Sequence, residues 1–150
     1  MRRAALCAVG VMAFGGCVIE PAHDNIAEVS VIAWGNSGSI FGANSVTILP
    51  DDRFEIRSRS SSATVNTNIR QAPSGTFETI ARDATRDLDR LPAITDIAPC
   101  PDYGTDFLET RDASGAIIDR AEASCGGSGL EAVLQSLNAQ LTRLSKADET

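Results

Sequence analysis

The alternation of apolar and polar residues predicts β-strands in the first half of the chain. β-Branched side chains and period-two alternation mark residues 28–34, 45–49, 53–59 and 63–69. Ile40 and Phe41 begin a return segment, and Pro50-Asp51-Asp52 is a turn signal before the third strand. The second and third strands are therefore expected to pair as a hairpin. In the fourth segment, Val65, Thr67 and Ile69 share one face with Ala63.

The second half of the chain changes to helical periodicity, with one hairpin between two helices. Apolar residues at helical spacing predict a helix that ends before Pro92: Phe77, Ile80, Ala84, Leu88 and Leu91. Residues 106–111 and 116–120 flank a turn in which Gly115 suits a left-handed position. Ser128 and Glu131 match a capping box before a second apolar stripe: Leu130, Val133, Leu134, Leu137, Leu141 and Leu144.

This order of strands, helix, hairpin and helix predicts an α+β fold. A small antiparallel sheet would carry both helices packed on one face. A chain of 150 residues suits one domain, expected over residues 28–146, with a frayed tail at 147–150.

The first residues have the layout of a secretory signal. Arg2 and Arg3 precede an uncharged stretch at 4–14, which is too short for a transmembrane helix of about 20 residues. The sequence Phe14-Gly15-Gly16-Cys17 resembles the lipobox of bacterial lipoproteins. The resemblance implies a diacylglycerol on the Cys17 thiol, cleavage of residues 1–16 and acylation of the new amino group. An ordinary secretory signal is the alternative.

The same resemblance predicts an extracytoplasmic, lipid-anchored protein. Residues 17–27 would form a lipidated tether that holds the domain close to its membrane. Residue 18 is Val and not the Asp that favours inner-membrane retention in this class. The periplasmic side of the outer membrane is therefore the expected location.

Two cysteines remain for a disulfide once Cys7 is removed and Cys17 is acylated. Cys100 and Cys125 lie on either side of the predicted hairpin turn, and disulfides form outside the cytoplasm. Their bridge would contribute about 3.5 kcal/mol in the chain-entropy model. A metal site would need more ligands, since the only histidine is His23 in the tether.

The sequence contains no convincing catalytic set. A Ser-His-Asp triad would depend on His23, and the net charge of −7 disfavours nucleic acid as a partner. Residues Gly35, Asn36, Ser37, Gly38 and Ser39 are expected to form a loop, which is the candidate binding loop. Three other clusters suggest chemistry: Gly126–Gly129 an anion site, Asp102, Asp106 and Glu109 a carboxylate cluster, and Arg53, Arg57 and Arg59 an anion-binding face. Each is better explained as ordinary loop or surface residues.

The leading hypothesis is a membrane-anchored envelope lipoprotein with a non-enzymatic binding or structural domain, no cofactor and a protein partner. An enzyme-inhibitor or small-ligand-binding module is the alternative. A carboxylate-based hydrolase is the least favoured.

Overall fold

The computed structural model describes residues 25–39, 42–61, 64–91, 102, 104–124 and 129–147. A short 3-10 helix, η1 (Asn25–Glu28), precedes the first strand. The strands are β1 (Val31–Ser39), β2 (Gly42–Ile48), β3 (Arg53–Arg59), β4 (Val65–Gln71), β5 (Thr105–Arg111) and β6 (Ile117–Ser124), and the helices are α1 (Thr76–Arg90) and α2 (Leu130–Ala147).

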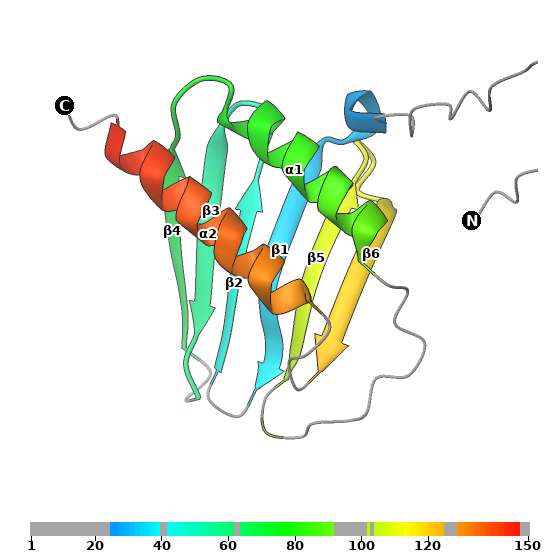
Figure 1. Cartoon of the computed structure of the whole chain (residues 1–150). Coiled ribbons are helices and arrows are strands. Elements are labelled where there is room, and N and C mark those ends of the chain that lie inside the picture. Colours follow the sequence, from blue (N-terminus) through cyan, green and yellow to red (C-terminus); the bar gives the residue numbers. More distant parts are fainter. Residues whose placement is uncertain are drawn as a thin grey trace, which may run out of the picture.

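The strands form one antiparallel sheet in the order β4-β3-β2-β1-β5-β6. The first four strands are a meander, and the β5–β6 hairpin adds to the free side of β1. Both helices lie diagonally across the same face of this sheet (Figure 1). The predicted α+β fold, with two helices on one face of an antiparallel sheet, is confirmed.

Asp52 fixes the start of α1 from the turn between β2 and β3. Its two carboxylate oxygens accept the backbone N–H groups of Gly75 at 2.9 Å and Phe77 at 2.7 Å. The residue at the N-cap position, Gly75, makes no side-chain cap bond. The predicted turn therefore also supplies the cap that the helix itself lacks.

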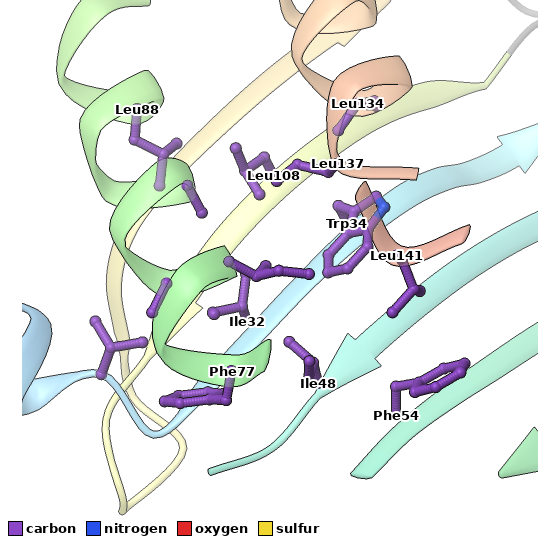
Figure 2. Packing of buried hydrophobic residues seen from close by; sticks show 14 of the residues in the cluster. Ile32, Trp34, Ile48, Phe54, Phe77, Leu88, Leu108, Leu134, Leu137 and Leu141 are labelled. Carbon is purple, nitrogen blue, oxygen red and sulfur yellow. The ribbon is translucent and has the colours of Figure 1, made fainter. Parts of the chain in front are cut away.

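The core lies between the sheet and the two helices. Figure 2 shows Ile32, Trp34, Ile48, Phe54 and Leu108 of the sheet meeting Phe77 and Leu88 of α1 and Leu134, Leu137 and Leu141 of α2. The apolar stripes predicted for both helices are confirmed as core, since Leu130, Leu137 and Ile80 are each 1% exposed or less. Aliphatic burial on one helix face is what holds helices of this length in place.

The other face of the sheet, called here the open face, is not covered by either helix (Figure 1). Arg53, Arg57 and Arg59 lie on it, so the row predicted on one strand is confirmed as solvent-facing. Large apolar side chains are exposed at the two edge strands: Val65 and Ile69 on β4, and Ile117 and Ile118 on β6.

Several predicted features lie outside the described residues. These include the lipobox at 14–17, His23 in the tether, Ile40 and Phe41, Ala63, Cys100, Cys125 and residues 126–128, with Ser128 of the capping box. Lipidation and the disulfide therefore stay predictions. Within the described part of the chain, neither helix has the length and apolar character needed to cross a bilayer.

Candidate functional site: a pocket beneath α2

Strand register arranges the helix-facing side of the sheet into rows. Trp34 pairs with Val46, and Val46 pairs with Ile56, so an apolar row crosses β1, β2 and β3. The next row towards the Ser39 end of β1 is polar. It contains, in spatial order, Asp106, Asn36, Asn44, Ser58 and Asn66. An apolar floor thus changes into a polar margin between positions two residues apart along β1, β2 and β3.

A pocket of about 510 Å³ lies where this margin meets the first half of α2. We call it the α2 pocket. The sheet side is formed by Trp34, Gly35, Asn36, Asn44, Ser45, Val46, Ile56, Gly104 and Asp106, and the helix side by Glu131, Leu134, Gln135 and Asn138. Its volume lies in the range of sites that hold small molecules, about 300–1,000 Å³.

Gly35 allows β1 and β2 to approach closely at the pocket. A Cβ atom at this position would lie 2.0 Å from the backbone oxygen of Asn44, and Gly35 has φ +152°. Every other residue type would collide with the neighbouring strand. The register of β1 and β2 then shifts between Asn36 and Ser39, which is a β-bulge. Bulges of this kind redirect side chains beside functional sites.

Hydrogen bonds between side chains hold the polar wall in place. Nε1 of Trp34 donates to Oδ1 of Asn138 at 2.9 Å, and Nδ2 of Asn36 donates to Oδ1 of Asp106 at 2.8 Å. On α2, Nε2 of Gln135 donates to Oε1 of Glu131 at 3.2 Å. The wall is therefore positioned by amide groups that bond across elements as well as within the helix.

The polar side chains of the pocket are amides and carboxylates. The lining includes two carboxylates, Asp106 and Glu131, and no basic side chain. The lining contains neither His nor Cys, and the Ser45 hydroxyl lies on the open face because side chains alternate along β2. No nucleophile therefore stands beside a base in this lining. In the described part of the chain, no group of three acidic, His or Cys residues is placed to hold a metal ion.

The predicted binding loop is a strand and not a loop. Residues Gly35, Asn36, Ser37, Gly38 and Ser39 form the last part of β1, paired with β2 on one side and, as far as Ser37, with β5 on the other. The reason is that two neighbouring strands satisfy the backbone of this glycine-containing segment. Gly35 and Asn36 nevertheless line the pocket, while Ser37 and Gly38 are exposed beyond it.

The three carboxylates that lie close together in the sequence do not form a cluster in the structure, because two of them lie on opposite faces of the sheet. Asp106 points to the helix side and enters the pocket, whereas Glu109 lies on the open face because side chains alternate along a strand. Glu109 is buried there and accepts from Arg111 at 2.6 Å and Arg120 at 2.7 Å. Asp102 is exposed in the connection before β5.

Sequence reasoning missed the helix side of the pocket. Glu131, Gln135 and Asn138 occupy a polar face of α2 whose spacing is typical of a solvated helix. Only the diagonal path of α2 over β1 brings that face to the polar row (Figure 1).

Comparison of the sequence with known proteins gives no family for this chain. No protein-family model matches the sequence, and no similar curated protein was found.

Proposed function

We propose that the chain is an extracytoplasmic, lipid-anchored binding protein whose domain holds a small polar ligand in the α2 pocket without chemically changing it. The observation that carries this proposal is the pocket itself, in which an apolar floor meets a wall of amides and carboxylates. Sites for small ligands combine these two elements, with few polar groups fixing orientation.

The charge of the lining narrows the class of ligand. Asp106 and Glu131 bring negative charge to the pocket, and no Lys or Arg lines it. Anionic ligands are disfavoured for this reason. The amides of Asn44, Gln135 and Asn138 offer both donors and acceptors. A neutral or cationic ligand with hydroxyl or amide groups and one apolar side is the chemistry that fits.

The proposed location and lipid anchor are based on the sequence alone. The lipobox-like Phe14-Gly15-Gly16-Cys17 supports attachment at Cys17, and the tether would leave the domain next to its membrane. Mass spectrometry of the membrane fraction should recover a diacylated and N-acylated peptide that begins at Cys17. An unmodified mature protein that begins elsewhere would contradict the anchor and leave the pocket proposal standing.

Trp34 provides the assay for the pocket, because it is the only tryptophan and it lines the site. The full chain should be titrated with N-acetylglucosamine, a neutral disaccharide and a dipeptide amide, with inorganic phosphate as the anionic control. We expect saturable fluorescence change with at least one of the first three probes and none with phosphate.

Two asparagines on the same polar row give a matched comparison. Asn44 lines the pocket and Asn66 lies two strands away, outside the lining, and both are exposed. Asn44→Ala should weaken binding of the active probe at least about fivefold, as a lost hydrogen bond of about 1 kcal/mol predicts. Asn66→Ala should bind like the unchanged chain. Equal effects of both substitutions would contradict the pocket.

A further inference from the structure

Strand β4 is an edge strand of the sheet, and its side chains carry none of the usual features that block pairing with another strand over residues 65–69. All seven residues from Val65 to Gln71 are exposed, and Val65 and Ile69 are each 60% exposed. Among the described residues no strand lies beyond β4. The opposite edge strand, β6, carries Asp119, Arg120 and Glu122, which are the charges that natural sheets use to block edge pairing. Residues 65–69 carry no charge.

Two backbone hydrogen bonds at the ends of the β3–β4 pair fix which backbone groups of β4 point outwards. The N–H of Ser60 donates to the oxygen of Thr64 at 3.1 Å, and the N–H of Ala72 donates to the oxygen of Asp52 at 2.9 Å. Both belong to the β3–β4 register, in which hydrogen-bonded and non-hydrogen-bonded pairs alternate. Even-numbered residues of β4 therefore bond to β3. The N–H and C=O groups of Val65, Thr67 and Ile69 point to the free edge.

The order of apolar and polar residue types along this edge is the same in both chain directions. Val65-Asn66-Thr67-Asn68-Ile69 is symmetric about Thr67. An antiparallel strand with this same sequence, related by a two-fold axis at Thr67, would place Val65 beside Ile69 of the second copy. Asn66 would stand beside the second copy's Asn68. The central Thr67 pair would be hydrogen-bonded, which is the pairing that its outward-pointing groups require.

We propose that β4 is a homodimerisation edge, on which two copies of this chain pair antiparallel about Thr67 to form one continuous sheet. Each copy contributes the outward groups of Val65, Thr67 and Ile69, so the backbone bonds of the new ladder are matched. The apolar side chains of Val65 and Ile69 meet on the open face. Arg70 stands opposite Thr64 of the second copy, so no like charges face each other across the axis. This inference does not depend on the α2 pocket.

Cysteine cross-linking tests the symmetry directly. In the proposed pairing, the two Cα atoms of residue 67 lie about 5.5 Å apart, within the range that a disulfide bridges. Thr67→Cys in the full chain, oxidised in envelope preparations, should add a reducible homodimer band that the unchanged chain does not give. Arg57→Cys is the matched control, since Arg57 pairs with Thr67 one strand further in and is also exposed. Its two copies would lie about 14 Å apart, three strand spacings, and should not link.

Sedimentation of the purified full chain provides the independent measurement. Ile69→Lys should raise the dimer dissociation constant at least about tenfold, because the change acts twice in a two-fold interface and places a charge against Val65. Ile118→Lys on β6 should leave it unchanged. A monomer at all concentrations, a cross-link from Arg57→Cys equal to that from Thr67→Cys, or a Thr67→Cys adduct with a different protein would each overturn the proposal.

Discussion

The indole N–H of Trp34 donates a 2.9 Å hydrogen bond to Oδ1 of Asn138 and so joins the central strand β1 to α2. Trp34 is 1% exposed, whereas Asn138 is on the exposed side of its helix. The bond therefore lies at the boundary between the core and the α2 pocket. Both residues line the pocket, so the bond joins its sheet side to its helix side.

Asn138→Ala should destabilise the fold by about 1–2 kcal/mol, because the indole donor loses its partner in a partly buried place. Urea unfolding followed by far-ultraviolet circular dichroism measures this in every variant, including those that lack Trp34. Gln135→Ala is the control, since the side-chain hydrogen bond of Gln135 goes to Glu131 within α2, and it should cost less than about 0.5 kcal/mol. If the Trp34→Phe and Asn138→Ala effects simply add in a double-mutant cycle, the bond contributes nothing.

Asp52→Ala should lower the free energy of unfolding by about 1–2 kcal/mol through loss of the cap on α1. The substitution also removes a residue that tolerates the left-handed φ of 60° at this position. Asp52→Asn retains an acceptor and the backbone preference, so it should cost less. Chemical unfolding of both variants decides this, and equal losses for Ala and Asn would argue against the capping role.

Gly35→Ala should destabilise the domain by about 3 kcal/mol or more, because the new Cβ would overlap the Asn44 backbone. Gly115→Ala is the control, because it introduces backbone strain without a steric overlap. Gly115 also has a positive φ, of 85°, but no atom lies within 4 Å of its Cβ position. That variant should lose about 1 kcal/mol. Thermal melts in which Gly35→Ala matched Gly115→Ala would refute the close strand approach.

Asp112 gives a pH-dependent prediction at the β5–β6 turn. The Ser114 hydroxyl and the backbone N–H of Ala116 donate to its carboxylate and hold the pKa of Asp112 below its ordinary value. Its stabilising effect should be complete above the unfolded-state pKa of about 3.9 and be lost as the pH falls through the lower folded-state pKa. NMR titration of the side chain should show the low pKa. Ser114→Ala should move it upwards, and an unmoved pKa would exclude the hydroxyl as the main cause.

Patterns that depend on neighbours in the chain were predictable from the sequence. The stripe of Leu130, Leu134, Leu137 and Leu141 defines the buried side of α2, and Gly115 takes the left-handed position expected in its turn. Both follow from local geometry. The fold class follows as well, since an amphipathic helix and an alternating strand each need a partner layer.

Features that depend on register and helix placement were not predictable. The apolar side of β4 faces the open surface because pairing with β3 puts Arg70 on the side of Phe54. Neither helix covers β4, so its polar side chains on the helix-facing side of the sheet stay in contact with solvent. The β3–β4 register therefore buries no unpaired polar group on this strand. The α2 pocket combines Asn36 and Asn138, which are far apart in sequence, and no local pattern links such residues.

The most direct test of the central claim maps the ligand on the domain. The ¹⁵N-labelled full chain should be titrated with whichever neutral probe changes Trp34 fluorescence, and its amide spectra should be recorded at each step. The account predicts saturable shifts confined to the pocket, at Asn36, Asn44 and Asn138 and the Trp34 indole, with none at Arg57 on the open face. Shifts that gather on the open face, or a spectrum that no probe changes, would contradict it.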